Sequence, residues 1–393
     1  MSYLNILFWA LLAAIVYSYL IYPVILAVIV SFKKTPNPNI QNGEYPTLTL
    51  FVTAFNEADY VTRKVENSLN LIYPKDKIKL IWVTDGSNDG TPELLNQFPE
   101  ILVLHQPERL GKIHAINRGM KFVMSDLVVF CDANTLLSEN ALLAIAHSFK
   151  NPKVGCVAGE KRIKTSDKEN AVASGEGLYW KYESWVKRLD ARFNSCIGAA
   201  GELFAVRTSL FKTVDRDTIL DDFVISLQIA MQGYSIDYCP EAYAVEEASA
   251  SINDEMKRKV RIASGSFQAI VLLKGLFNIF KFPKLNFQFI SHKVFRWIVI
   301  PISLLLLIPL NLILVLNVNE STIYLIILLA QFTMYLIVLI GYFFQNKRVG
   351  WGLLFAPYYF FMANLAMWLG FFRFVKGNQP VQWEKARRHH SKN

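Results

Sequence analysis

The chain has 393 residues, of which 53% are hydrophobic and 19% are charged, and its formal net charge is +9. A soluble domain is nearer to about 45–50% apolar and about 25% charged, so this composition favours a membrane part combined with a water-soluble middle. The chain has no basic run with interleaved aromatic residues and no CxxC or HExxH spacing, which argues against a nucleic-acid groove, a disulfide framework and a zinc site.

The first predicted element is a membrane span. Residues Leu4 to Val30 are apolar and uncharged, and Lys33 and Lys34 follow them. The run is long enough to cross a bilayer, and its basic pair comes after the apolar core rather than before it, which distinguishes a retained span from a signal peptide. We therefore expect a transmembrane helix over 1–34, with the following domain in the cytosol.

A linker and then an alternating strand and helix pattern come next. Residues 35–46 are rich in Pro, Asn and Gly, which is typical of a linker. Apolar strands separated by helices over 47–255 predict an α/β domain with a doubly wound, mostly parallel sheet. Strands are expected at 47–53, 78–85, 101–105, 126–132 and 154–159, and helices at 58–70 and 113–124. In such a sheet, ligands bind beyond the carboxyl ends of the strands.

The remaining chain returns to the membrane. The region 256–292 holds a basic stretch and an apolar but interrupted segment at 263–282, which is typical of amphipathic interface helices. About three transmembrane helices are expected over 293–376, near 294–316, 321–344 and 351–375. A basic tail, 377–393, should stay in the cytosol, although three spans would place it outside, so either one segment is re-entrant or the tail breaks the rule.

Two motifs at the ends of predicted strands carry acids. TAFNE ends in Glu57, and VTDGSNDGT contains Asp85 directly after an apolar strand. Glu57 can instead belong to a helix start capped by Asn56, and the Asp85 motif can be an ordinary polar turn. Alternatively, both acids lie where a doubly wound sheet binds its ligand.

Two further motifs suggest phosphate and metal binding. In RLGKIHAINRG, Lys112 precedes a predicted helix, and an ammonium at a helix N-terminus suits an anion, although a solvated surface lysine is the simpler reading. In FCDAN, Asp132 and Asn134 are two positions apart and share a face of an extended segment. Such an oxygen pair suits a divalent cation that bridges phosphates.

The last two motifs hold adjacent acids and a basic helix face. TILDDF places Asp221 and Asp222 before a predicted helix, where they act as a general base or simply as an N-cap. In MKRKVRIASG, Arg258 and Arg261 are three positions apart and share a helical face. They are suited to lipid headgroups or to a diphosphate.

Together and in this order, the motifs over about 45–270 resemble those of membrane family-2 glycosyltransferases, the group that contains cellulose, chitin and hyaluronan synthases and related enzymes. The resemblance implies that one set of residues binds the nucleotide-sugar donor: Glu57, Asp85, Lys112, Asp132, Arg258 and Arg261. It implies Mg²⁺ or Mn²⁺ on Asp132 and Asn134. Asp222 is implied as the catalytic base, and Gly201, Glu202 and Asp221 as acceptor-binding residues.

The resemblance further implies an inverting transfer from a nucleotide sugar, with a UDP-sugar as the expected donor, to a glycan or lipid-linked acceptor. The enzyme would be a hexosyl- or N-acetylhexosaminyltransferase, multi-pass in the plasma membrane, with lipids and possible oligomeric or secretion partners and no nucleic acid. Asn134 replaces the second acid of the family's DxD motif, and Ile262 replaces the Trp of its QxxRW motif. Addition of a single sugar, or a non-catalytic scaffold role, are therefore alternatives to polymerisation.

Overall fold

The computed structural model describes residues 3–33, 44–164, 171–247, 251–317, 322–344 and 352–377. The linker expected over 35–46 lies outside the described residues except for its last three positions. The basic tail expected over 377–393 also lies outside them, except for its first residue.

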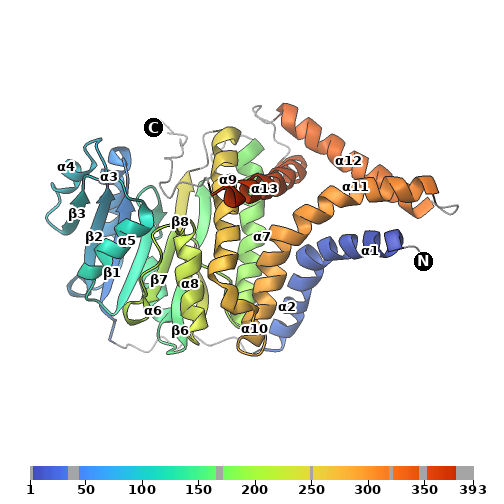
Figure 1. Cartoon of the computed structure of the whole chain (residues 1–393). Coiled ribbons are helices and arrows are strands. Elements are labelled where there is room, and N and C mark those ends of the chain that lie inside the picture. The colour runs from blue at the N-terminus through green and yellow to red at the C-terminus, as the bar shows by residue number, and fades with distance from the viewer. Residues whose placement is uncertain are drawn as a thin grey trace.

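A long apolar helical segment opens the chain (Figure 1). It consists of α1 (Tyr3–Val16), the π-helical turn η1 (Tyr17–Ile21) and α2 (Tyr22–Ser31). Over Tyr3–Ser31 it is long and apolar enough to cross a membrane. The long N-terminal apolar helix expected from the sequence is therefore present.

The middle of the chain forms one eight-stranded sheet with the strand order β3-β2-β1-β4-β7-β6-β8-β5. The strands are β1 (Leu48–Ala54), β2 (Ile78–Asp85), β3 (Ile101–Gln106), β4 (Leu127–Asp132), β5 (Leu136–Leu137), β6 (Val154–Lys164), β7 (Leu203–Arg207) and β8 (Ser235–Glu247). All five strands expected from the sequence are present, within a few residues at their ends.

The sheet is mixed in direction. Strands β3, β2, β1 and β4 are parallel, as are β6 and β8. Strand β7 runs antiparallel to β4 and β6, and the short β5 runs antiparallel to β8. The mostly parallel sheet is confirmed in its larger part. The antiparallel β7 was not among the strands expected from the sequence.

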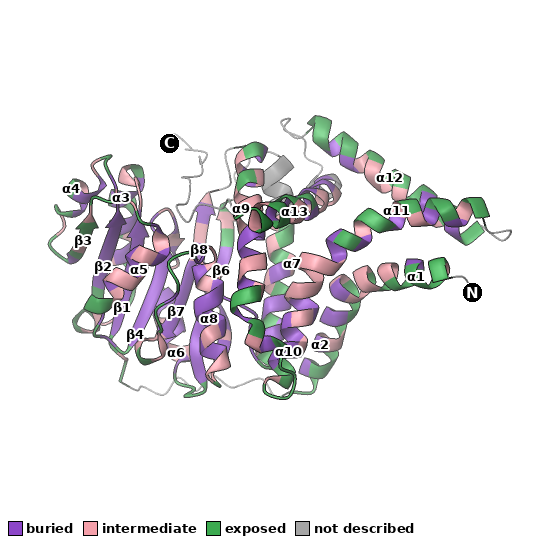
Figure 2. Ribbon diagram, in the orientation of Figure 1, coloured by how far each residue is buried: buried purple, intermediate pink, exposed green. Residues whose placement is uncertain are grey.

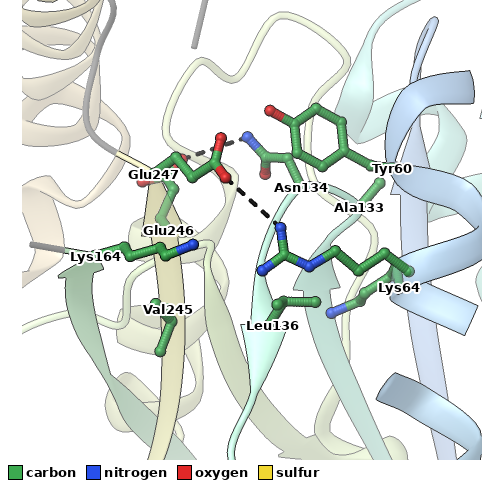
Figure 3. Close-up of a pocket in the computed structure, with 10 residues that line it drawn as sticks. Tyr60, Lys64, Ala133, Asn134, Leu136, Lys164, Val245, Glu246 and Glu247 are labelled. Carbon is green, nitrogen blue, oxygen red and sulfur yellow. Dashed lines mark hydrogen bonds and ion pairs between the residues drawn. The ribbon is translucent and has the colours of Figure 1, made fainter. Parts of the chain in front are cut away.

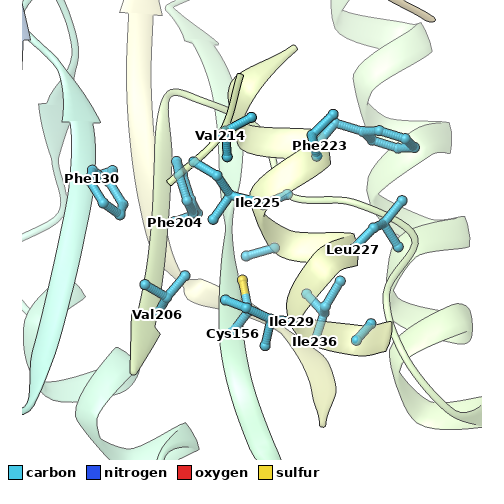
Figure 4. Close-up of a cluster of buried hydrophobic side chains, with 14 of the residues drawn as sticks. Phe130, Cys156, Phe204, Val206, Val214, Phe223, Ile225, Leu227, Ile229 and Ile236 are labelled. Carbon is cyan, nitrogen blue, oxygen red and sulfur yellow. The ribbon is translucent and has the colours of Figure 1, made fainter. Parts of the chain in front are cut away.

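Helices cover both faces of the sheet, as a doubly wound fold requires. Along the fully buried β1, Phe51 belongs to one apolar cluster, whereas its neighbours Leu50 and Val52 belong to the other. Figure 4 shows part of the first cluster, in which Phe130 and Phe204 of the sheet lie near α8. The helices are α3 (Ala58–Leu69), α4 (Thr91–Leu95), α5 (Lys112–Gly119), α6 (Ala141–Ser148), α7 (Ala171–Phe193) and α8 (Asp221–Met231).

The C-terminal part is helical. It comprises α9 (Ile252–Leu272), α10 (Pro283–Gln288), the π-helix η6 (Phe289–Val299), α11 (Ile300–Asn317), α12 (Thr322–Phe344) and α13 (Gly352–Val375). Pro283–Asn317, Thr322–Phe344 and Phe355–Val375 are each long and apolar enough to span a membrane. Figure 2 shows exposed faces along α1, α11 and α12, and these faces carry apolar side chains that suit lipid. Four such helices indicate a multi-pass membrane protein.

Helix α9 differs from the sequence-based expectation for residues 256–292. Ser251 caps it by accepting a hydrogen bond from the Asp254 backbone N–H, so the helix starts at Ile252 and the boundary expected at residue 256 falls inside it. The segment expected at 263–282 is thus the second half of α9 followed by a 3-10 turn, Lys274–Phe277. Helix α9 packs closely against α13, where Gly370 lies directly on Ala263.

A buried charged junction joins α7 to two of the membrane segments. Glu183 of α7 is 2.6 Å from Lys293 Nζ, 3.0 Å from Arg296 Nη1 and 3.2 Å from His292 Nε2. Asp190, also on α7, lies 2.6 Å from His292 Nδ1 and accepts a hydrogen bond from the Tyr22 hydroxyl. Buried charges are tolerated only when they are paired in this way. The junction therefore fixes α7 to both α2 and η6.

Candidate active site

Five residues from four separate parts of the sequence meet at the carboxyl ends of the central strands. Lys112 Nζ is 2.8 Å from Asp132 Oδ1 and 4.0 Å from Asp221 Oδ2. A Cβ atom added to Gly201 would lie 3.2 Å from Lys112 Nζ and 3.3 Å from Asp222 Oδ2. The structure thus brings residues predicted for the donor, the acceptor and catalysis into one site.

The loop before α5 explains how Lys112 is positioned. Asp85, at the end of β2, accepts hydrogen bonds from the backbone N–H groups of Leu110 (3.0 Å) and Gly111 (2.8 Å). Gly111 has φ of 103°, a conformation that glycine adopts without strain. Asp85 is buried and both of its carboxylate oxygens serve this loop. Its position supports the start of α5 and so holds Lys112 in the site.

The acidic pair at the start of α8 is not a helix cap. The N-cap residue of α8 is Leu220, so Asp221 and Asp222 are the first two helical residues. Asp222 Oδ1 accepts a hydrogen bond from the Phe223 backbone N–H at 2.8 Å. Negative side chains in the first turn are favoured by the helix dipole. This leaves the second carboxylate oxygen of Asp222 directed toward Gly201.

Burial and neighbouring charges shift the pKa values of the site. Burial, followed by the negative charge of Asp221, raises the pKa of Asp222 to about 7, while Lys112 opposes this rise. Burial opposes the charge on Lys112, but Asp132, Asp221 and Asp222 outweigh it and raise the pKa of the lysine. Near neutral pH the site therefore holds a carboxylate able to take up a proton and a permanently charged ammonium.

The two predicted arginines of α9 have different surroundings. Arg261 is half-buried, and although burial lowers its pKa, the charges of Asp221, Asp222 and Asp132 oppose that effect. Arg258 is instead held by Glu255, with Nε and Nη2 each donating over 2.9 Å. The charges of the acidic cluster therefore act on Arg261, whereas the side chain of Arg258 pairs with Glu255.

Glu57 lies at the start of α3, next to Thr91 at the start of α4. It is the N-cap residue of α3, and its backbone N–H donates to Thr91 Oγ1 at 2.9 Å. Asn56, expected as an alternative cap, has φ of 54° and accepts a hydrogen bond from the Asn88 backbone N–H. Glu57 therefore borders the loop that follows Asp85.

Asp132 and Asn134 are the metal ligands expected from the sequence. The described residues contain no group of three or more His, Cys, Asp or Glu side chains arranged for a metal ion. Figure 3 shows Asn134 at the wall of a pocket, where its amide nitrogen faces Glu246 at 3.5 Å. This orientation leaves the amide oxygen available. Asp132 and Asn134 offer carboxylate and amide oxygens, which are the ligand types that a hard divalent cation prefers.

Sequence reasoning missed two charged residues beside Glu202, namely Lys161 and Glu246. Lys161 Nζ is 2.5 Å from Glu202 Oε1 and 2.5 Å from Glu246 Oε2. Burial disfavours the charge on Glu202, but Lys161 outweighs this and lowers the pKa of Glu202 to about 2. Lys161 and Glu246 belong to no motif, and a lone charged residue in a strand gives no indication of a partner about 40 or 85 positions away.

The sequence of this chain is similar to those of known glycosyltransferases. The model of "Glycosyl transferase family 2" matches residues 49–215. The poly-beta-1,6-N-acetyl-D-glucosamine synthase of Staphylococcus aureus (strain MSSA476) is 28% identical over 263 residues, which cover 64% of this chain and 62% of that protein. The Staphylococcus epidermidis synthase is 27% identical over 247 residues, which cover 61% of this chain and 58% of that protein. The alignments thus span less than two thirds of these relatives.

A solved structure shares the fold over nearly the whole chain. The mannosyltransferase PcManGT from Pyrobaculum calidifontis, solved in complex with GDP-Man and Mn²⁺, superimposes with a TM-score of 0.71. The match covers 95% of this chain and 99% of that one, at 20% sequence identity. At this identity the likeness concerns the fold alone.

Proposed function

We propose that this chain, whose residues 49–215 match the model of glycosyl transferase family 2, is a nucleotide-sugar glycosyltransferase that transfers a sugar, with inversion, to a glycan or lipid-linked acceptor at the membrane. The observation that carries the proposal is the placement of Asp222 beside Gly201 and Lys112. A carboxylate whose pKa is raised to about 7 is suited to accept a proton from a hydroxyl group near neutral pH.

The proposed reaction is a single displacement. The acceptor oxygen forms a bond to the anomeric carbon while the bond from that carbon to the diphosphate breaks, and the hydroxyl proton passes to Asp222. The positive charges of Lys112 and Arg261 face the position where the leaving diphosphate gains charge. Charges fixed in advance around a developing anion are among the strongest contributions to catalysis.

A divalent cation is proposed as the cofactor. Asp132 and Asn134 would hold Mg²⁺ or Mn²⁺, which would add positive charge to the diphosphate. The Mn²⁺ in the PcManGT complex supports this assignment by analogy of fold. Lys112 already lies on one oxygen of Asp132, so this lysine would sit beside the cation and share the same phosphate charge.

The donor and product are proposals drawn from the relatives. The staphylococcal relatives are named poly-beta-1,6-N-acetyl-D-glucosamine synthases, which makes UDP-N-acetylglucosamine the first donor to test. Ile262 stands where the polymerases of the resembling group carry a tryptophan, and this favours the alternative in which one sugar is added to a lipid carrier. A non-catalytic scaffold is disfavoured because Asp132, Asp222 and Lys112 are together in one site.

The orientation in the membrane is also proposed. Lys33 follows the first span, which supports a cytosolic catalytic domain in the plasma membrane. The turn after α9 exposes Phe277, Ile279 and Phe280 by 41%, 55% and 97%. These side chains, with nearby lysines, support contact of this turn with the lipid headgroup region.

The test uses membranes that contain the full chain. Radiolabelled UDP-N-acetylglucosamine, UDP-glucose and GDP-mannose are supplied in turn, and the products are separated by size. One donor should give label in lipid or glycan, either as a single addition or as a ladder. Asp222→Asn should lower transfer by about 10²–10⁴-fold while donor binding is retained. A D222N protein that transfers sugar at the wild-type rate would remove this residue from the proposed role.

A further inference from the structure

A buried lysine lies between two acids that come from separate parts of the sheet. Lys161 of β6 is 1% exposed, and its Nζ atom is 2.5 Å from Glu202, which precedes β7, and 2.5 Å from Glu246 of β8. The Trp180 ring of α7 is 5.0 Å from the same nitrogen. The buried ammonium is therefore enclosed by two carboxylates and an aromatic ring, which together offset the cost of removing it from water.

Each of the two acids leads to a different half of the site. Glu202 follows Gly201 in the chain, and a Cβ atom added to Gly201 would lie 3.2 Å from Lys112 Nζ and 3.3 Å from Asp222 Oδ2. Glu246 faces the amide nitrogen of Asn134 at 3.5 Å. One acid thus borders the proposed acceptor position, and the other orients the side chain proposed to hold the metal.

We propose that Lys161 is a positioning residue that fixes the acceptor side and the metal side of the transfer site to each other. This inference rests on the proposed function. Lys161 touches neither proposed substrate and acts through Glu202 and Glu246. By binding both carboxylates it sets the place of the turn at Gly201 and, at the same time, the orientation of the Asn134 amide.

The electrostatics give the reason why the lysine matters. Lys161 is the main influence that keeps the pKa of Glu202 low against burial. If the Lys161 ammonium were removed, the buried carboxylates of Glu202 and Glu246 would lose their shared counter-charge. They would then move apart or one of them would take up a proton.

The two acids allow the coupling to be tested one side at a time. The variants are K161M, E202Q and E246Q, with K153M as a matched control because Lys153 is exposed and precedes the same strand. K161R keeps the charge. Mn²⁺ binding to the purified full chain in the presence of UDP is measured by electron paramagnetic resonance. Transfer from UDP-N-acetylglucosamine to a short β-1,6-linked N-acetylglucosamine oligosaccharide gives the acceptor KM.

The expected result is a pattern rather than a single loss. E246Q should weaken Mn²⁺ binding by about tenfold and leave the acceptor KM near the wild-type value, because neighbours of a metal ligand typically change affinity by about 10–100-fold. E202Q should raise the acceptor KM with Mn²⁺ binding unchanged. K161M should weaken Mn²⁺ binding and also raise the acceptor KM. K161R should show a smaller change in each quantity, and K153M should change neither of them.

Several outcomes would overturn the inference. One is a K161M protein whose Mn²⁺ binding and acceptor KM both equal the wild-type values. Another is a K161M protein in which only one of these two quantities changes. The third is a wild-type chain that binds no Mn²⁺. Mn²⁺ binding is measured without turnover, so a failure of this inference can be distinguished from a failure of the proposed function, which is decided by the wild-type and D222N transfer rates.

Discussion

Asp222 should cost the protein stability, and replacing it should make the protein more stable in a pH-dependent way. The pKa of Asp222 is raised from 3.8 to about 7 by burial and by Asp221. Between about pH 4 and pH 7 the folded state keeps a proton that the unfolded chain has released, so stability falls as the pH rises through this window. Asp222→Asn has no such proton to lose. The stability gained by the variant should therefore be small at pH 4.5 and complete at pH 8.

The size of the gain follows from the shift. A rise of about three pKa units, at about 1.36 kcal/mol per unit, sets a ceiling of about 4 kcal/mol. Half of this ceiling, about 2 kcal/mol, would raise the melting midpoint by about 4–8 °C for a domain of this size. The assay is thermal unfolding of the detergent-purified chain at pH 4.5, 6 and 8. D215N at the exposed Asp215 is the matched control and should show no gain. An equal gain at all three pH values, or none at pH 8, would refute the reasoning.

Three more substitutions test the candidate site and the buried charged junction of α7. D221N removes the charge that, after burial, raises the pKa of the proposed base Asp222, so the acid limb of the kcat–pH profile should move down by roughly one to two pH units; an unmoved limb would contradict the proposed role of Asp222. G201A places a Cβ atom 3.2–3.3 Å from two site side chains and should lower kcat at least about tenfold, whereas G177A, with open space around it, should be harmless. E183Q leaves buried cations at the charged junction without their acid and should lower stability by about 3–5 kcal/mol in a denaturation series, whereas E66Q at an exposed position should change it little.

The sequence was most informative where a local pattern coincides with a strand end. Asp85 and Asp132 each follow an apolar, β-branched run, and both runs form central strands that place these acids at one edge of the sheet. Lys112 follows the glycine that starts its helix, so its place was also predictable. For these residues, the position in the fold follows from the element to which they belong.

The same local patterns did not reveal how the residues are paired. Asp85 was predicted to bind the donor, and the sequence did not reveal that both of its oxygens accept hydrogen bonds from the backbone that precedes Lys112. Arg258 and Arg261 share a helical face, but the buried Glu255 binds the first of them. Lys161 was not singled out at all. Each case depends on a partner supplied by tertiary packing, which periodicity and spacing do not encode.

Helix α7 gives a physical reason for placing the catalytic domain between membrane segments. Its second half carries Glu183 and Asp190, whose buried bonds to η6 and Tyr22 fix it to two of the membrane-spanning segments. Three residues before Glu183, the ring of Trp180 lies over Lys161, next to the acceptor turn. Because residues three apart lie on neighbouring parts of one helical face, a displacement of the spans relative to the sheet would move the Trp180 ring as well. The same helix thus links the position of the membrane segments to the acceptor side of the site, which is the side a membrane-bound acceptor has to reach.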